Sequence, residues 1–497
     1  MTDISFPIIS ILIFLPIVGG ISIYFINKIT GTRGVQLYAL LIGLIELVLS
    51  LYAYYVILNG DSGAEYNFVE GPYSWITSIQ GIDYYLGMDG LSAPLVLISS
   101  ILSVLVILGS WNLIKERNVL YYSLLLIFVG AIMGVFTSLN MILFYVFWDV
   151  VLIPMFIFIG IWGGPRRKYA AMKFLLFTFA GSVFMLLAFI MIYFVAIPNT
   201  FNIPELMGQI PYDLQVLASF MFFLGFGVKL AIVPFHTWLP DAHVEAPAPI
   251  SVFLAGLLLK MGGYGFIRFN LGLLPEASAA YSWFFISIGI ITMFYGAIVA
   301  LRQTDLKRMI ALTSVNHMGF VLLGAFTGTL LGISGSVFQM FTHAFAVGIM
   351  FMLSGYVHEF TGTRDINIIK GLKFSSPRLA TLLVLGSMAA MAIPIFSTFL
   401  SEFMVIVGAI QINPQYAVTA VIPVITVSYF LWMIKRTVTS TPEKPVVKHD
   451  LNNLSTVALC LYLLPLLLTL IAPWLVLEMI DPLSQFYVAL FLSLIHI

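Results

Sequence analysis

The stretch GVKLAIVPFHTWLP at 227–240 places Lys229 five residues before Pro234, within an otherwise apolar run. Proline inside a helix removes a backbone hydrogen bond and clashes with the preceding turn. In a bilayer, polar backbone groups freed in this way persist only where protein or water satisfies them. The stretch therefore predicts a membrane helix that is interrupted at Pro234, close to a buried charge.

A second stretch of the same kind, AMAIPIFSTFLSEF at 390–403, combines Pro394 with Glu402. Apolar runs of about 20 residues can cross a bilayer, and the two stretches belong to the seventh and twelfth of fourteen such runs. Because five is odd, helices that lie five apart point in opposite directions, as inverted repeats around a central ion site require. The predicted spans are 6–28, 35–58, 91–110, 118–138, 139–163, 168–196, 215–239, 247–270, 278–301, 307–330, 332–358, 377–408, 416–434 and 454–478.

Composition agrees with a membrane protein, because 61% of the residues are hydrophobic and only 9% are charged, against roughly 25% charged in soluble domains. The single cysteine, Cys460, excludes an intrachain disulfide and a cysteine-bound metal or iron–sulfur site. The net charge of zero implies no nucleic-acid partner. Because the chain has no nucleotide-binding or haem-attachment motif, we expect it to bind no cofactor and no metal itself.

Basic residues support the span count, because 18 of the 22 lysines and arginines fall in alternate loops. By the positive-inside rule these loops face the cytoplasm, so both termini are predicted on the periplasmic side. The basic loops are 28–33, 115–117, 166–168, 302–308, 364–378 and 435–448.

Six ionisable residues lie deep within predicted spans, where one charge costs about 2.5–3.5 kcal/mol on insertion scales. We expect them to form a path for protons or ions, with an acid–lysine pair at one end and a carboxylate at the other. The alternatives are a static ion pair, hydrogen-bonded core histidines, or a purely structural membrane scaffold. The six residues are Asp149, Lys229, Lys260, His317, His343 and Glu402.

Four further polar residues have less defined roles. Lys173 either extends its charge toward the basic end of its span or takes part in function, and Glu46 is a candidate for a subunit contact. His236 and His243 flank the break at Pro234, where a gate or loop anchor is a better interpretation than a metal site, because too few ligands lie nearby.

The motif GVKLAIVPFHTWLPDAHVEAPAPISVFLAGLLLKMGGYG (227–265) and the motif DLKRMIALTSVNHMG (305–319) resemble the antiporter-like family of proton-translocating membrane subunits. This family includes subunits of respiratory complex I and of Mrp sodium/proton antiporters, and the resemblance covers nearly the whole chain. Glu402 matches one branch of this family, since other branches carry lysine at that place. Asp149 departs from the family's glutamate, and its arm is shorter by about 1.5 Å, which puts direct contact with Lys229 in doubt.

The resemblance implies an all-α integral membrane protein with about 14 transmembrane helices, two inverted five-helix repeats and two discontinuous helices. Residues 1–138 would hold the N-terminal helices and a periplasmic loop, 118–270 the first repeat, 278–434 the second, and 454–491 a C-terminal helix and tail. The segment LSLIHI at 492–497 back-translates into a sequence like a sequencing adapter, and we expect it to be read-through from an unfinished assembly.

The implied function is proton translocation coupled to quinone reduction in other subunits of an NADH:quinone oxidoreductase in the bacterial inner membrane. NADH, FMN, iron–sulfur clusters and quinone would then belong to partner subunits, and NuoL-like and NuoN-like subunits would be neighbours. The alternatives are an Mrp-type antiporter subunit and the membrane subunit of an energy-converting hydrogenase.

Overall fold

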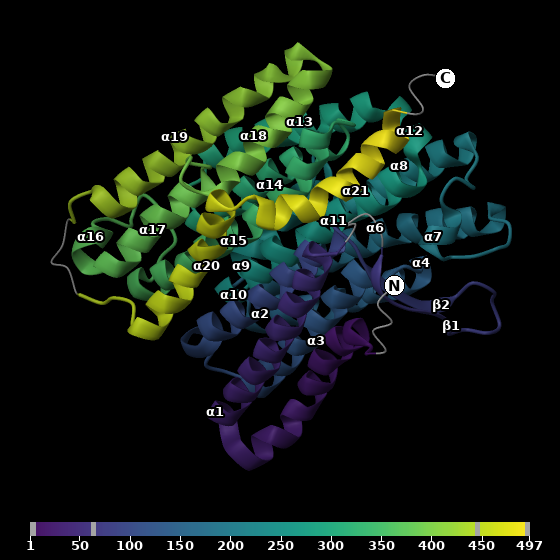
Figure 1. Ribbon diagram of the computed structural model, residues 1–497. Coiled ribbons are helices and arrows are strands. Elements are labelled where there is room, and N and C mark those ends of the chain that lie inside the picture. The colour runs from purple at the N-terminus through teal and green to yellow at the C-terminus, as the bar shows by residue number, and fades with distance from the viewer. Residues whose placement is uncertain (1–5, 61–65, 443–447, 493–497) are drawn as a thin grey trace.

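A computed structural model describes residues 6–60, 66–442 and 448–492 of the chain. It is a bundle of helices, shown in Figure 1 with the N-terminal helices at one side and the later ones at the other. Among the described residues, twelve helices are long and apolar enough to cross a membrane. Each of the fourteen ranges predicted from the sequence is occupied by helix. The all-α membrane fold is therefore confirmed, while the exact number of crossings stays a prediction.

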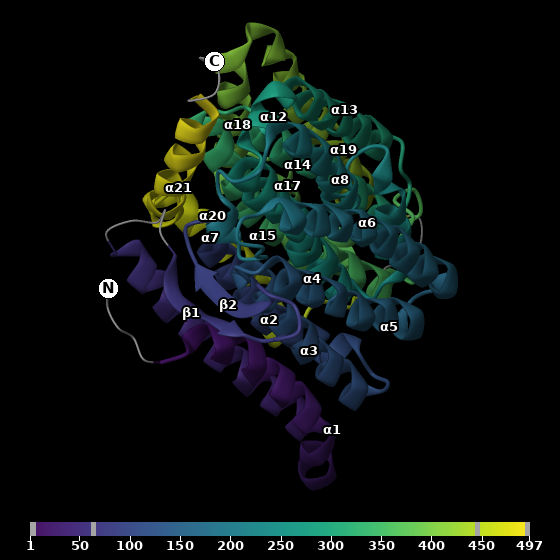
Figure 2. The same cartoon turned by 90° about the vertical axis from the view of Figure 1, so that its right-hand side faces the viewer.

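The N-terminal region consists of three helices and a small sheet. Helix α1 (Ile8–Leu58) contains the first two predicted spans and turns at Gly31, whose φ of +69° breaks the helical geometry. The predicted polar loop at 59–90 contains strands β1 (Asn67–Ser74) and β2 (Asp83–Met88), which pair antiparallel. Figure 2 shows this hairpin beside α1. Helices α2 (Ser92–Leu113) and α3 (Asn118–Thr137) follow.

The first half of the remaining bundle runs from residue 141 to residue 271. Many of its spans consist of shorter helical pieces, because prolines and π-helical turns interrupt them. The elements are α4 (Met141–Val150), α5 (Leu152–Trp162), α6 (Arg167–Val195), α7 (Ile203–Leu206), α8 (Tyr212–Leu230), η1 (Phe235–Thr237), α9 (Trp238–Glu245), α10 (Ala248–Phe253), η2 (Leu254–Leu258), α11 (Leu259–Gly265) and η3 (Phe266–Leu271).

The second half is built around α15 (Leu330–Thr361), which is buried along nearly all of its length. Helices α14, α18 and α10 pack against it. The other elements of this half are α12 (Pro275–Ala280), α13 (Ser282–Leu301), α14 (Leu306–Ala325), α16 (Leu372–Ser375), α17 (Pro377–Ala390), α18 (Ser397–Ile412), η4 (Pro414–Val421), α19 (Ile422–Ile434) and η5 (Lys435–Thr439).

Both predicted breaks are present, and they share a backbone conformation. Helix α8 ends at Leu230 and α9 begins at Trp238, while α17 ends at Ala390 and α18 begins at Ser397. Ala231 directly follows the first half of one helix, and Ala392 lies two residues past the first half of the other; their φ angles are +58° and +55°, a left-handed region that alanine rarely adopts. The two discontinuous helices are therefore confirmed.

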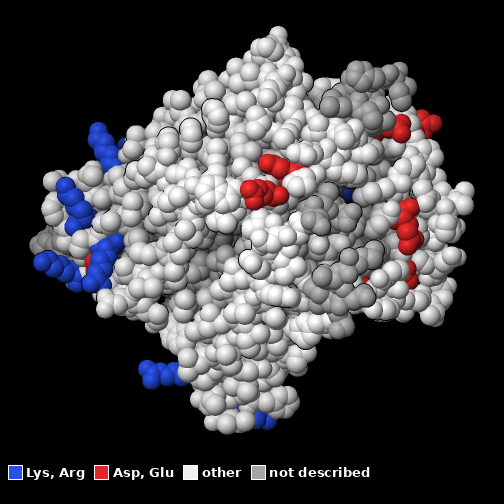
Figure 3. All heavy atoms as spheres, viewed as in Figure 1, with Lys and Arg blue, Asp and Glu red and all other residues white. Residues whose placement is uncertain are grey.

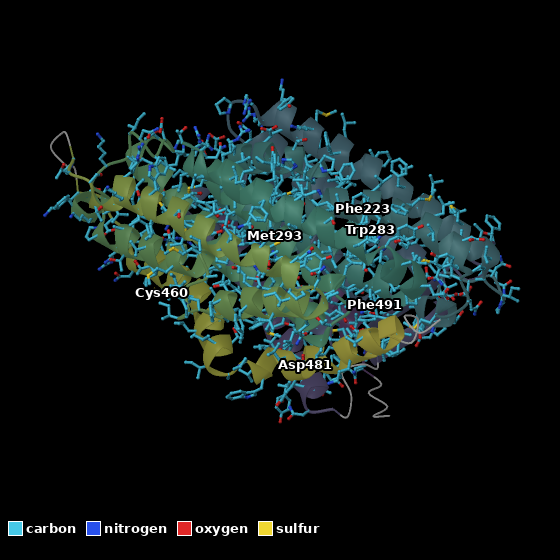
Figure 4. All side chains as sticks on the ribbon, turned by 90° about the horizontal axis from the view of Figure 1, so that it is seen from above. Phe223, Trp283, Met293, Cys460, Asp481 and Phe491 are labelled. Atoms are coloured by element: carbon cyan, nitrogen blue, oxygen red, sulfur yellow. The ribbon has the colours of Figure 1, made fainter. Side chains whose placement is uncertain are left out.

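The C-terminal region differs from the prediction. Helix α20 (Asn453–Ile471) ends within the predicted span 454–478, and the expected tail forms a second helix, α21 (Trp474–Leu492). Pro473 lacks a backbone N–H group and cannot continue the ladder of α20. Figure 4 shows α20 and α21 along one side of the bundle. Of the suspected read-through at 492–497, only the backbone of Leu492 belongs to the described residues.

Candidate functional site

The predicted path starts at the acid–lysine pair Asp149 and Lys229, which we call open because, among the described residues, no hydrogen bond joins Lys229 to the carboxylate. Lys229 is 1% exposed near the end of α8, and its Nζ has no hydrogen-bond partner among the described residues. The ammonium group lies 4.9 Å from the ring centroid of Trp148, a cation–π distance. Asp149 follows Trp148 on α4, with its carboxyl beside Tyr145 and Ser182 and within electrostatic range of Lys229. The structure thus places the two groups in one region without joining them directly.

Lys260 lies in α11 and is fully buried. It follows the π-helical turn η2, a feature that widens a helix and frees carbonyl groups from the regular ladder. Its Nζ donates to the carbonyl oxygen of Ala255 within that turn, at 2.6 Å, and lies 2.5 Å from Nδ1 of His343. The predicted link between Lys260 and a histidine is therefore a direct contact.

The two histidines and Glu402 continue this contact into the second half of the bundle. The rings of His343 on α15 and His317 on α14 meet edge to face, with centroids 5.3 Å apart. Nε2 of His317 lies 3.3 Å from Oε1 of Glu402 on α18, and both residues are buried. Lys260, His343, His317 and Glu402 thus form an unbroken row of titratable side chains from four spans.

Glu402 lies just past the second break, in a polar setting. Ser401 Oγ donates to Gln339 Oε1 at 2.5 Å and lies 2.9 Å from Thr342 Oγ1. Thr398 Oγ1 donates to the carbonyl oxygen of Ala389 at 2.7 Å, which joins the start of α18 to the end of α17. The break at Pro394 is thus bridged by a hydrogen bond close to the carboxylate that ends the row.

The outlying candidates fall in different places. Lys173 Nζ pairs with Asp241 of α9 at 2.7 Å, so its charge is neutralised within the protein instead of extending to the lipid surface. His236 lies within the first break, its ring 4.6 Å from that of Tyr295. Glu46 is 0% exposed, so its carboxyl lies inside the chain and not on its surface, and a role at a subunit contact stays a prediction.

His243, near the end of α9, is fully buried and stacks on Phe351 of α15, with ring centroids 4.2 Å apart and planes at 6°. In the described part of the chain neither ring nitrogen has a hydrogen-bond partner. No cluster of three metal-ligating side chains occurs among the described residues.

Two buried cations were not recognised as structurally important from the sequence. Arg268 in η3 forms a two-pronged ion pair with Asp89, and Lys307, assigned to a basic loop, lies in the first turn of α14 and is only 4% exposed. Arg268 could have been singled out because it lies within a span, but its partner Asp89 is 179 residues away. Nothing in the sequence separates Lys307 from Arg308 beside it, which is only half-buried.

Comparisons with known protein families match most of the chain. Residues 138–427 match the model described as NADH:quinone oxidoreductase/Mrp antiporter, TM. Residues 68–140 match the amino terminus of NADH-ubiquinone oxidoreductase chain 4.

Among curated proteins, NADH-quinone oxidoreductase subunit M of Rickettsia prowazekii (strain Madrid E) is 38% identical over 450 residues, covering 90% of this chain and 91% of its own. NAD(P)H-quinone oxidoreductase chain 4 1 of Synechococcus elongatus is 41% identical over 445 residues, covering 88% and 82%.

Among solved structures, a chain of respiratory complex I from Thermus thermophilus aligns with a TM-score of 0.87 at 27% identity, covering 97% of this chain and 99% of that one. A chain of the Mrp complex from Dietzia sp. aligns with a TM-score of 0.85 at 18% identity, over 97% and 99%. At that identity the second likeness shows the fold alone.

Proposed function

The chain belongs to the NADH:quinone oxidoreductase/Mrp antiporter family of membrane subunits, and on this premise we propose that it translocates protons as the subunit M-type component of an NADH:quinone oxidoreductase. The observation that carries the proposal is the row Lys260, His343, His317 and Glu402, whose neighbouring groups contact one another across four spans. Lysine, histidine and carboxylate side chains can each take up and release a proton when their surroundings change.

The proposed route begins at the cytoplasmic side, near the break after α8. Protons load Lys229 while Asp149 supplies a counter-charge, and Lys229 gives up its proton when that carboxylate moves away. The proton then passes through Lys260 and the two histidines to Glu402, which releases it to the periplasm. The breaks at Pro234 and Pro394, with His236, act as gates because half-helices can shift without breaking a continuous ladder.

Further roles are proposed for the outlying residues and for the two halves. Lys173 holds α6 to α9 through Asp241, and Glu46 is an internal carboxyl of the N-terminal helices. Residues 118–270 and 278–434 act as inverted repeats, which is supported by the equivalent breaks at Ala231 and Ala392.

The proposed orientation places both termini in the periplasm of a bacterial inner membrane. The charge distribution supports it, because Figure 3 shows most lysines and arginines at the left and lower edges of this face and most acidic residues at the centre and right. NuoL-like and NuoN-like subunits would be the neighbours. NADH, FMN, iron–sulfur clusters and quinone would lie in other subunits.

A sodium/proton antiporter subunit shares the fold but has weaker support. The relatives named subunit M or chain 4 are 37–41% identical over most of this chain, whereas the Mrp chain is 18% identical.

The test uses the purified complex in proteoliposomes, with NADH oxidation and proton uptake recorded together. Lys229→Ala and Glu402→Ala should each abolish coupled turnover or lower the number of protons moved per NADH. Cys460→Ala, at an exposed position on α20, is the matched control and should behave as the wild type. Wild-type turnover and stoichiometry in both charge variants would refute the route. Proton movement that requires sodium would favour the antiporter alternative.

A further inference from the structure

A narrow apolar groove runs along the outer side of α17, between this helix and η5. Its volume is about 310 Å³, and its apolar lining includes Ala380, Val384, Leu385 and Val438. The one hydroxyl in its wall, Thr381 Oγ1, already donates to the carbonyl oxygen of Pro377 at 2.9 Å. From Pro377 to Leu385 the wall follows about 12 Å of helix. The groove is therefore long enough to take an extended apolar chain.

The groove lies on a helix that leads to one of the two breaks. Helix α17 is the first half of the second discontinuous helix and ends at Ala390, before the break that precedes Glu402. It packs against α15 and α20, while on its outer side Thr381 is exposed and Val384 and Leu385 are half-buried. A molecule in the groove would thus contact this half-helix directly.

A lysine closes the loop end of the groove. Lys373, on α16, belongs to the lining and is exposed. Its Nζ lies 4.8 Å from the ring centroid of Phe374, and within the described ranges no carboxylate forms an ion pair with it. The carboxylate at the start of α17, that of Asp450, accepts from the backbone N–H groups of Arg378 and Leu379. The described part of the chain therefore supplies no counter-charge to Lys373.

Further cations lie at this end of the bundle. Gly371 N–H donates to Ser440 Oγ at 3.3 Å, which holds α16 against the end of η5. Lys435 is exposed and begins η5, the element that supplies Val438 to the groove. In Figure 3 lysines and arginines gather at the left edge, where Figure 1 places α16 and α17. The groove thus has an apolar body and an electropositive end.

This combination matches one class of membrane molecule. A phospholipid acyl chain can fill an apolar groove, while the phosphate lies at the level of the helix ends, where a lysine ammonium can form a charge-assisted hydrogen bond with it. Lipids with a net negative charge are also attracted by clustered basic side chains near the membrane surface. An apolar segment of a neighbouring subunit would fill the groove but would leave the charge of Lys373 without a partner.

We propose that the groove between α17 and η5 is a binding site for an anionic phospholipid, with one acyl chain along Pro377–Leu385 and the phosphate on Lys373. The bound lipid links α16, α17 and η5 from the membrane side. None of the lining residues belongs to the row of titratable side chains, so the inference does not depend on the route of the protons.

The test uses the purified complex, freed of bound lipid in detergent and then incubated with photoreactive lipids. The two probes are phosphatidylglycerol and phosphatidylcholine with the same diazirine-bearing acyl chain. Mass spectrometry quantifies the labelling of peptides that contain residues 377–385. Labelling by phosphatidylglycerol should exceed that by phosphatidylcholine about fivefold, the ratio that about 1 kcal/mol of attraction per basic side chain gives.

Substitutions at two positions locate the lipid. Lys373→Gln should lower phosphatidylglycerol labelling about fivefold, to the level of phosphatidylcholine, whereas Lys373→Arg keeps the charge and should keep the labelling. Thr381→Trp fills the groove from an exposed position and should remove labelling by both lipids. Lys28→Gln removes an exposed lysine from α1. It is the matched control and should leave the labelling of residues 377–385 unchanged.

Equal labelling by the two lipids in the wild type, unchanged in Lys373→Gln, would mean that unselected lipid surrounds this helix, and the proposed site would be wrong. No labelling by either lipid would mean that a neighbouring subunit covers the groove, which also overturns the inference. The wild-type comparison of the two lipids decides even if a variant fails to assemble. Neither outcome bears on proton transport, which Lys229→Ala and Glu402→Ala test separately.

Discussion

Arg268 and Lys229 are both cations buried in the same bundle, each with a carboxylate from another helix or loop nearby, but only Arg268 closes its ion pair. Arg268 Nη1 and Nη2 lie 2.6 and 2.7 Å from the two carboxylate oxygens of Asp89, and both residues are about 1% exposed. Lys229 has a ring face at 4.9 Å in place of a partner atom, and Asp149 Oδ1 has no hydrogen-bond partner within the described ranges.

The surroundings of the closed pair also hold its two charged groups in place. Asp89 also accepts hydrogen bonds from the backbone N–H groups of Leu91 and Ser92, and Arg268 Nε donates to the Tyr264 hydroxyl. Both carboxylate oxygens of Asp89 and all three guanidinium nitrogens of Arg268 therefore have partners, which fixes the charge in place. An arginine also stays protonated, whereas a buried lysine can exchange its proton. The closed pair suits an anchor between the hairpin region and η3, and the open pair suits a group that must change state.

The largest expected effect comes from breaking the closed pair. Arg268→Leu leaves the Asp89 carboxylate buried without its counter-charge, which should destabilise the protein by about 3–5 kcal/mol. Thermal unfolding in detergent and the amount of assembled complex would measure the loss. The double variant Asp89→Leu/Arg268→Leu removes both charges and should recover most of it. An Arg268→Leu protein that unfolds at the wild-type temperature would show that the pair is not an anchor.

Breaking the open pair should change stability little and proton transport strongly. Asp149→Asn removes a charge that makes no direct ion pair, so stability should stay within about 1 kcal/mol of the wild type. Coupled proton transport should fall strongly, because Lys229 loses its only nearby carboxylate in the proposed route. Asp149→Glu keeps the charge and should retain transport, and both are measured in proteoliposomes. An inactive Asp149→Glu would mean that this protein has rebuilt the pair around the shorter aspartate arm.

The contrast also shows which features can be predicted from a single sequence. Apolar runs and prolines determine the structure of the residues next to them in the sequence. The helical spans and the breaks near Pro234 and Pro394 can therefore be predicted from the sequence alone. The six ionisable residues could be singled out because charges within apolar runs stand out, and the structure brings four of them into contact, Lys260, His343, His317 and Glu402. The closed pair was missed, since 179 residues separate Asp89 from Arg268 and only packing brings them together.

Other features depend on tertiary structure in the same way. The π-helical turns η2 and η3 lie within a helical, mostly apolar stretch, so the pattern of apolar residues does not reveal them. Helix α21 lies where the sequence predicts a tail, and its mean hydropathy of 1.2 is lower than that of the other long apolar helices among the described residues. The burial of Lys307 depends on α9, a segment more than fifty residues earlier in the chain. The sequence therefore could not distinguish Lys307 from the exposed basic residues of a loop.

The smallest expected effect concerns the backbone at the two helix breaks, the first of which lies beside the open pair. Ala231 and Ala392 have φ of +58° and +55°, which costs alanine roughly 1–2 kcal/mol, while glycine adopts this region freely. Glycine also makes the unfolded chain more flexible, which offsets about 0.4–1 kcal/mol of that gain. Ala231→Gly and Ala392→Gly should therefore each stabilise the protein by up to about 1 kcal/mol, measured by thermal unfolding. Ala218→Gly, in the regular part of α8, is the matched control and should lose about 1 kcal/mol. Equal losses at all three positions would mean that the breaks store no strain, and that the open region differs from the closed one in its side chains only.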